Sequence, residues 1–467
     1  MNPGMKPVLI LAALLVWPCA AMAQDAGGAA ADNSDPHAGS LWERDALTGD
    51  WGGIRKRLDD SGIQLGGIYT AEGLGNIGGG VRTGAIYEGR LELDLTLQLD
   101  TLAGWTGATF YASAYQTHGR GLSANKLGGN LMDVSNIEAL PATRLFDLFL
   151  QQDLYDGMLS VRLGQIAADD EFITSRYAEP FMNSTFGWPA LTSVDLPTGA
   201  PIYPLATPGL RLKLAPTERL SIMAAVFSGN PAGPGTGDPQ KLDPSGTNFR
   251  LGDGAFAIGE AAYGVHQAKD DPGLPAMFKL GGWYHTGRFG DEHFDTVGRS
   301  LANPASNGVP LQHRSDFGLY AIAHQMIWRK TAGTDQGIGV FLRLLGSRPD
   351  RNLVDLYADS GISYTGLLAD RDNDVLAFGF AFAHISGAAS ALDRDRIAFT
   401  GQSQPVRDFE ATLELTYRMQ VTQWWVLQPD IQFVFHPGGH GSDPTDPTGR
   451  RPIGDAKIIG LRTQITF

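Results

Sequence analysis

The chain has 467 residues, with 36 Lys and Arg against 50 Asp and Glu, which gives a formal net charge of −14. This acidic balance disfavours nucleic acid as a partner, because binding to a phosphate backbone depends on basic side chains. The single cysteine, Cys19, excludes a disulfide framework, a thiolate metal site and cysteine catalysis from the rest of the chain.

The N-terminal segment has the order of parts that is typical of a secretory signal peptide. Lys6 is the only charged residue before an apolar run at 8–17, and an Ala-Met-Ala cleavage sequence follows at 21–23. The apolar run is shorter than the roughly 20 residues that a membrane-spanning helix needs. We therefore predict a signal peptide over residues 1–23 and export of the mature chain.

The next segments differ in composition and in hydrophobic period. Residues 24–46 are small and polar, which predicts a flexible leader. Residues 47–63 contain the sequence TGDWGGIR, and Ile54 and Leu58 can share one side of a short helix there. Over residues 64–467 the hydrophobic period changes to two, which predicts strands.

The clearest predicted strand extends over residues 90–100. Its five leucines alternate with charged or polar residues, so that one face is wholly apolar and the other is charged. A membrane barrel would place the leucines in lipid and the charges in a wet interior, whereas a soluble sandwich would bury the leucines in its core. Similar alternation recurs at 209–214, 278–286, 375–385, 412–421 and 424–436. Pro429 interrupts the last of these runs, and we expect a bulge there.

Short and long connections alternate between these strands. Long segments rich in Gly, Pro, Asn and Asp lie at 118–143, 169–207, 229–251 and 289–313. Short turns at one rim and long loops at the other are typical of outer-membrane barrels and distinguish them from sandwiches. We therefore predict an all-β, transmembrane antiparallel β-barrel in the lipid bilayer. Its amphipathic last strand, which ends at Phe467, is the expected signal for the outer-membrane assembly machinery.

Seven segments resemble motifs of one protein family, the carbohydrate-selective porins of the OprB family, and they follow the same order. They are TGDWGGIR at 48–55, LGQ with DEF at 163–172, FSGNP at 227–231, LGGWYHTG at 280–287, RPDRN at 348–352, ELTYR with LQPDIQ at 414–432, and the last strand at 456–467. The resemblance covers the chain from about residue 45 to its end. It implies a 16-stranded porin, in the outer membrane of a Gram-negative-type bacterium, that admits glucose and other sugars by passive diffusion.

A sugar that crosses such a barrel exchanges hydrogen bonds with water for hydrogen bonds with protein, and its C–H faces stack on aromatic rings. Inward-facing charged and aromatic residues are therefore the candidates for the pore lining, although charges of this kind can also simply solvate the wall. These candidates are Arg90, Glu92, Asp94, Arg162, Arg211, Lys213, Trp283, His285, Glu414 and Arg418. The longest connection, 169–207, is expected to fold inward and narrow the pore, with Arg176, Tyr177 and Trp188 as candidates.

Enzyme motifs are absent from the predicted strands, which show neither a G-x-S-x-G elbow nor an H-E-x-x-H pair. His436, Gly439 and His440 share a loop, which we interpret as a polar turn. We predict no catalytic residue, metal or cofactor. Two alternatives stay open: a general or other-solute porin on the same scaffold, and a non-transport outer-membrane barrel such as a hydrolase or an adhesin.

Overall fold

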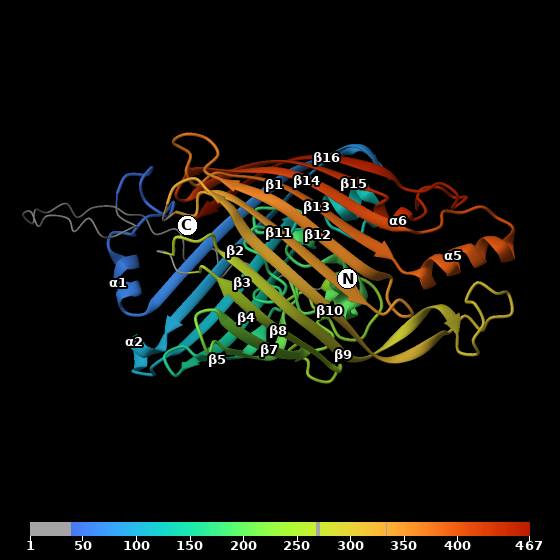
Figure 1. The fold of residues 1–467 in the computed structure, drawn as a ribbon, viewed down its shortest axis with the longest axis horizontal. Helices are drawn as coiled ribbons and strands as arrows, with labels where there is room; N and C mark the ends of the chain where they lie inside the picture. Colours follow the sequence, from blue (N-terminus) through green and yellow to red (C-terminus); the bar gives the residue numbers. More distant parts are fainter. Residues whose placement is uncertain (1–38, 268–270, 333) are drawn as a thin grey trace, which may run out of the picture. The chain divides into compact units, whose positions relative to one another are not determined.

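The structure, a computed structural model, describes residues 39–267, 271–332 and 334–467. Within these residues, sixteen strands form one closed antiparallel barrel, in which consecutive strands pair and β1 pairs with β16 (Figure 1). Closure leaves no unpaired sheet edge, which a bilayer requires because lipid cannot hydrogen-bond to the backbone. The predicted antiparallel barrel and its strand number are confirmed. The predicted signal peptide, residues 1–23, lies outside the described residues.

The elements follow one another around the barrel in chain order. The strands are β1 (Ile63–Gly80), β2 (Gly84–Gln98), β3 (Ala108–Gly119), β4 (Ala142–Leu154), β5 (Leu159–Ile166), β6 (Thr207–Leu214), β7 (Leu220–Ser228), β8 (Ala255–Val265), β9 (Ala276–Asp295), β10 (Pro310–Arg329), β11 (Gly337–Ser347), β12 (Val354–Thr365), β13 (Val375–Ile385), β14 (Phe409–Thr422), β15 (Trp425–Phe435) and β16 (Gly454–Thr466). The helices are α1 (Ile54–Asp60), α2 (Leu99–Ala103), α3 (Ala190–Asp195), α4 (Pro239–Leu242), α5 (Gly387–Thr400) and α6 (Pro437–His440). Three short helical turns complete them: η2 (Ser123–Leu127), η3 (Ser184–Phe186) and η4 (Pro197–Gly199). No helix in the described ranges is long and apolar enough to cross a membrane.

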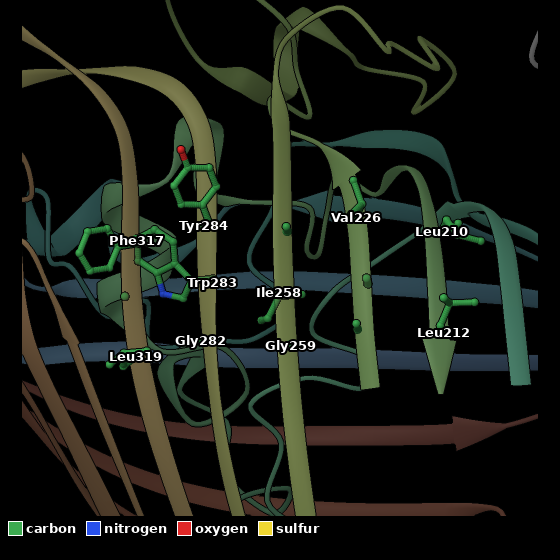
Figure 2. A pocket seen from close by; sticks show the side chains of 14 residues that line it. Leu210, Leu212, Val226, Ile258, Gly259, Gly282, Trp283, Tyr284, Phe317 and Leu319 are labelled. Carbon is green, nitrogen blue, oxygen red and sulfur yellow. The ribbon is translucent and has the colours of Figure 1, made fainter. Parts of the chain in front are cut away.

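Outward-facing side chains form an apolar band around the barrel. On β13 Phe378 is 46% exposed, whereas its neighbour Ala377 is fully buried. On β6 the exposed Leu210 and Leu212 flank the buried Arg211. Figure 2 shows exposed side chains of β6 to β10 around a depression of about 420 Å³: Leu210, Leu212, Val226, Tyr284, Phe317 and Leu319. An apolar outer face of this kind is suited to contact with lipid chains.

The two rims differ in the length of their connections, as the sequence indicates. One rim carries short turns, such as 155–158 and 423–424, and the other carries the long segments 120–141, 167–206 and 386–408. The expected loop at 289–313 is wrong in part, because β9 extends to Asp295 and β10 begins at Pro310. Beyond the lipid both faces of a hairpin are solvated, so the strands continue without the hydrophobic alternation that reveals them in the sequence.

Two further details of the predicted strands need correction. The strand at 90–100 ends at Gln98, and α2 follows it over Leu99–Ala103, with Gly104 after it at a positive φ of 66°. Pro429 causes no bulge. Before and after Pro429 along β15, the pairs Met419–Leu427 and Thr416–Asp430 keep one register with β14. On its other edge β15 pairs with β16, where Pro429 lies opposite Leu461. The proline lacks an N–H for the ladder, and the strand keeps its pleat.

The predicted short helix near the N-terminus is confirmed as α1, and it lies where the barrel closes. Arg55, buried in this helix, donates through Nη2 to the backbone oxygens of Phe467 (2.6 Å) and Leu65 (3.2 Å) and through Nη1 to that of Gly49 (3.3 Å). The N–H of Leu47 donates to the carbonyl of Thr466 (2.8 Å). The segment before β1 therefore fastens the end of β16, beside the β1–β16 seam.

The segment 167–206, here called the inward loop, packs inside the barrel against the wall formed by β7 to β13. Its buried apolar residues include Phe172, Ile173, Phe181, Phe186, Trp188 and Leu191. They form one cluster with inward-facing wall residues, among them Phe256, Trp283, Tyr320 and Phe341. Small residues on the wall make room for this packing. At Gly379 an added Cβ would lie 2.7 Å from Cζ of Phe186 and 2.8 Å from Cε1 of Phe181.

We predict that Gly379→Val displaces Phe181 and Phe186 and loosens the inward loop. Overpacking of this kind costs about 1–3 kcal/mol, so the urea midpoint of unfolding in detergent micelles should fall. Gly73→Val is the matched control, because a Cβ at this exposed position on β1 meets nothing within 4 Å. Equal midpoints for the two variants would contradict the packing described here.

Candidate solute pathway

Carboxylates of the barrel wall hold the inward loop by its backbone. Glu414 on β14 accepts hydrogen bonds from the N–H groups of Met182 (2.6 Å) and Asn183 (2.9 Å). Glu260 on β8 accepts one from the N–H of Ile173 (3.1 Å). A loop inside a barrel has no neighbouring strand to pair with, so its buried N–H groups need other acceptors. Charged acceptors make these hydrogen bonds stronger than neutral ones would.

Arg343 on β11 performs the complementary role for the carbonyl groups of the loop. Its buried guanidinium forms an ion pair with Asp359 on β12, with Nε 2.9 Å from Oδ1. It also donates to the carbonyl oxygens of Ile173 (2.9 Å), Thr185 (3.0 Å) and Gly187 (3.3 Å). A buried ion pair is tolerated where further hydrogen bonds use the remaining donors. The loop backbone supplies those acceptors, so that the pair and the loop stabilise each other.

A cavity of about 570 Å³ lies on the other side of the inward loop, between the loop and the wall made by β1 to β4 and β12 to β16. Charged, aromatic and amide side chains dominate its lining. They include Arg90, Tyr115, Asp169, Arg176, Tyr177, Tyr203, Arg418, Gln428 and Arg462. Because the loop packs against one wall, it leaves a polar space along the opposite wall.

Arg90 on β2 stands between two tyrosine rings at this cavity. Its guanidinium carbon lies 4.7 Å from the ring centre of Tyr115 and 5.1 Å from that of Tyr203. Its Nη2 lies 3.2 Å from Oε2 of Glu92 on the same strand. The two rings and the carboxylate hold the guanidinium in place at the cavity wall, as expected for cation–π contacts combined with an ion pair.

A second arginine lines the cavity from β16. Nε of Arg462 donates to Oε1 of Glu72 on β1 (2.6 Å), and its Nη2 donates to Oδ1 of Asn136 (2.5 Å). Arg418 on β14 also lines the cavity, together with Gln428. The guanidinium and amide groups present hydrogen-bond donors from several strands to one space.

Two aspartates of the inward loop add acceptors to the lining. Asp169 accepts a hydrogen bond from the N–H of Tyr203 (3.1 Å), and burial raises the pKa of its carboxyl to about 6. Burial also raises the pKa of Asp170, and the neighbouring charges of Asp147 and Asp169 act in the same direction. The cavity lining therefore contains two carboxyl groups whose pKa lies above the ordinary value for aspartate.

Four of the predicted pore residues lie together at this cavity. Arg90 and Arg418 line it from the wall, and Arg176 and Tyr177 line it from the inward loop. Arg176 also forms an ion pair with Asp335 (3.2 Å) in the turn between β10 and β11. Glu92 contacts Arg90. Asp94 faces inward on β2, where its carboxylate lies over Gly66.

The remaining predicted residues are not among those that line the cavity. Glu414, Trp188, Trp283 and His285 are buried under or within the loop region, and His285 Nε2 lies 2.6 Å from the carbonyl oxygen of Gly229. Arg162 and Arg211 share the carboxylate of Glu171, at 3.4 and 2.7 Å. Lys213 is exposed near the short turn that follows β6.

Lining residues outside the sequence-based selection include Tyr115, Tyr203 and Arg462. Arg462 lies on the polar face of the last predicted strand, so the alternation of that strand could have identified it. Tyr115 lies on β3 opposite Glu92, a pairing that depends on the register of two strands. Tyr203 reaches Arg90 only because the inward loop returns across the barrel, and no local pattern encodes that path.

A closed barrel with an apolar outer band, an inward loop and a polar cavity defines the class of protein: it is a porin. The family model for "Carbohydrate-selective porin, OprB family" matches residues 82–467. The chain therefore belongs to the OprB family of carbohydrate-selective porins, which are channels of the outer membrane.

Individual relatives agree with this assignment. Porin B of Pseudomonas aeruginosa is 26% identical over 439 residues, which cover 90% of this chain and 91% of that protein. The putative porin QuiX of Acinetobacter baylyi is 22% identical over 458 residues, which cover 92% and 95% of the two chains. The high-pH structure of Pseudomonas putida OprB superposes with a TM-score of 0.79 at 25% identity and covers 92% of this chain and 99% of its own.

We predict that Arg343→Met destabilises the barrel by about 3–5 kcal/mol, because it leaves the buried carboxylate of Asp359 without its partner. Urea-dependent unfolding in detergent micelles measures the change. Arg348→Met is the control, since Arg348 pairs with Asp350 at a half-exposed position, and its loss should cost less than about 1 kcal/mol. The double variant Arg343→Met/Asp359→Leu should recover part of the stability. A wild-type midpoint for Arg343→Met would refute the role of the ion pair.

Proposed function

We propose that this porin lets glucose and related monosaccharides diffuse passively along the cavity beside Arg90. The observation that carries the proposal is the Arg90 guanidinium held between the rings of Tyr115 and Tyr203 at a polar cavity. A sugar ring offers hydroxyl groups to the charged donors and C–H faces to the aromatic rings. The same wall therefore meets both kinds of surface that a sugar presents.

The distribution of charge also supports a neutral solute. Guanidinium groups of Arg90, Arg418 and Arg462 share the cavity with the carboxylates of Asp169 and Asp170. A pathway for phosphate would be expected to carry an excess of basic groups, and one for cations an excess of acidic groups. Donors and acceptors in mixture suit hydroxyl groups, which both donate and accept. Binding of this kind is reversible, as diffusion through a channel requires.

The proposal extends to the way the chain reaches the membrane. The proposed organisation has four parts: a signal peptide for export at 1–23, a leader at 24–46, the segment 47–63 with its helix, and a porin domain at 64–467. Ala46 is buried, and the carbonyl of Leu41 accepts a hydrogen bond from Nε1 of Trp424 (2.7 Å), so the last part of the leader contacts the barrel. We also propose that the strand ending at Phe467 is recognised by the assembly machinery.

We predict that glucose reduces the ion current through single channels in a planar bilayer and that Arg90→Gln weakens this block about tenfold or more. A hydrogen bond from a charged donor contributes about 1.5–3 kcal/mol, and about 1.4 kcal/mol corresponds to a factor of ten. Arg418→Gln should act in the same direction. Lys213→Gln is the control, because Lys213 is exposed and does not line the cavity. Glucose block of wild-type strength in both arginine variants would exclude this pathway.

Liposome swelling distinguishes a sugar-selective porin from a general porin on the same scaffold. Glucose should enter faster than amino acids of equal size, whereas equal rates would indicate a general porin on the same scaffold. A barrel that carries no current at all would indicate a non-transport role.

We predict that the mature protein begins at Gln24, because the small residues at 21–23 form the cleavage sequence. Edman sequencing of protein extracted from outer membranes tests this. Ala23→Arg should retain the uncleaved precursor, whereas Gln24→Asn should be processed normally. An N-terminus inside the apolar run at 8–17 would contradict the proposed boundary.

A further inference from the structure

A cluster of two histidines and one aspartate lies at the long-loop rim, away from the proposed pathway. His436 and His440 flank the turn that contains α6, directly after β15, and Asp408 directly precedes β14 (Figure 1). Nδ1 of His436 lies 2.9 Å from Oδ1 of Asp408, and Nδ1 of His440 lies 3.7 Å from Oδ2. One ligand atom from each of the three residues lies within 4.8 Å of the others.

We propose that Asp408, His436 and His440 bind Zn²⁺ or a similar divalent transition metal that prefers imidazole ligands. Zinc sites with three protein ligands and a water use these residue types. Each ligand atom lies about 2 Å from the metal in such a site, so the ligands lie roughly 3–3.5 Å from one another. The separations of 2.9 and 3.7 Å from the carboxylate lie close to this range, and the stacked imidazole rings turn apart when both face one metal. All three side chains are partly exposed, which leaves the metal accessible to water.

The backbone of the turn is arranged to direct both imidazoles toward one carboxylate. His436 and His440 have positive φ values of 50° and 70°, a conformation uncommon for residues other than glycine. The imidazole rings stack with their centres 4.2 Å apart. A single histidine would suffice to pair with Asp408. The second histidine, His440, brings another imidazole to the same carboxylate.

Buried groups beneath the turn hold it rigidly. The N–H of Gly438 donates to Oε2 of Glu410 (2.7 Å), a carboxylate that also accepts from the N–H groups of Leu131 and Met132. Gly439, with a φ of +70°, lies over Ile385, where a Cβ would be 2.5 Å from Cγ1 of that residue. The ligand set is therefore largely preorganised, which favours metal binding because little order must be gained.

The surroundings of the cluster supply supporting contacts for the ligands. Oδ1 of Asp408 accepts a hydrogen bond from the N–H of Phe409 (2.6 Å), and the ring of Phe409 lies 4.5 Å from that of His436. The N–H of His436 donates to Oδ1 of Asp455 (2.9 Å). A hydrogen bond to a ligating carboxylate, such as that from Phe409 to Asp408, orients the ligand, and the loss of such a partner typically weakens metal affinity about 10- to 100-fold. A bound metal would tie the loop after β15 to the start of β14.

The test is calorimetric titration of ZnCl₂ into the full porin, purified in detergent without a histidine tag and stripped with EDTA. We expect one zinc ion per barrel, with an affinity that falls at least about tenfold in Asp408→Asn and in His440→Gln. His384→Gln is the matched control, because His384 pairs with a single carboxylate, that of Asp355 (2.7 Å), at a similar exposure. Binding by the wild type with no loss in either cluster variant, or no binding by the wild type, would overturn the proposal.

A second measurement removes any dependence on how the variants fold. X-ray absorption at the zinc edge of the wild-type complex should show the scattering of two imidazole rings. A spectrum without imidazole scattering would place zinc elsewhere and would refute the site. Heat-dependent migration on gels and an unchanged single-channel conductance verify that the variants are folded barrels.

Discussion

The inward loop depends on charged groups that the barrel wall presents to its backbone. Arg343 takes three carbonyl groups of the loop, and Glu414 and Glu260 take N–H groups from it. A loop of this length inside a membrane barrel would otherwise carry buried polar groups without partners. Because Arg343 also needs Asp359, two neighbouring strands and the loop become one interdependent unit. These contacts fix the position of the loop in the barrel, and with it the size of the cavity beside Arg90.

The wall that the inward loop packs against carries the larger apolar cluster, and the wall along the cavity carries more polar groups. On β12 and β13 the inward positions are small, such as Gly361 and Gly379, and phenylalanines of the loop occupy the space above them. On β1 to β3 and β14 to β16 many inward positions are charged or polar, among them Glu72, Thr416 and Gln428, and Leu74, Val434 and Ile458 form a smaller apolar cluster. The loop therefore packs against β7 to β13 by the hydrophobic effect, and it meets β14 and β15 through hydrogen bonds to Glu414 and Gln428.

The sequence predicts the barrel better than it predicts the site. Alternation such as that of residues 90–98 depends only on neighbouring residues, because opposite faces of one strand meet lipid and lumen. It therefore identifies Arg90 and Arg418 as inward-facing, and both line the cavity. It cannot show which inward residues the loop covers. Glu414 has the same pattern as Arg418 four positions later, yet it is bound to the loop backbone. That difference arises from contacts between residues more than 200 positions apart.

Arg55 has a consequence for the order in which the barrel forms. Its guanidinium binds the carbonyl of Phe467, the last residue of the chain, from a helix that precedes the first strand. Hairpins between consecutive strands can form locally, but this bond needs the two most distant parts of the barrel domain at once. The Arg55–Phe467 hydrogen bond therefore requires the β1–β16 pairing that closes the cylinder. An incomplete sheet would lack this hydrogen bond and would keep two open edges, which distinguishes it from a closed barrel.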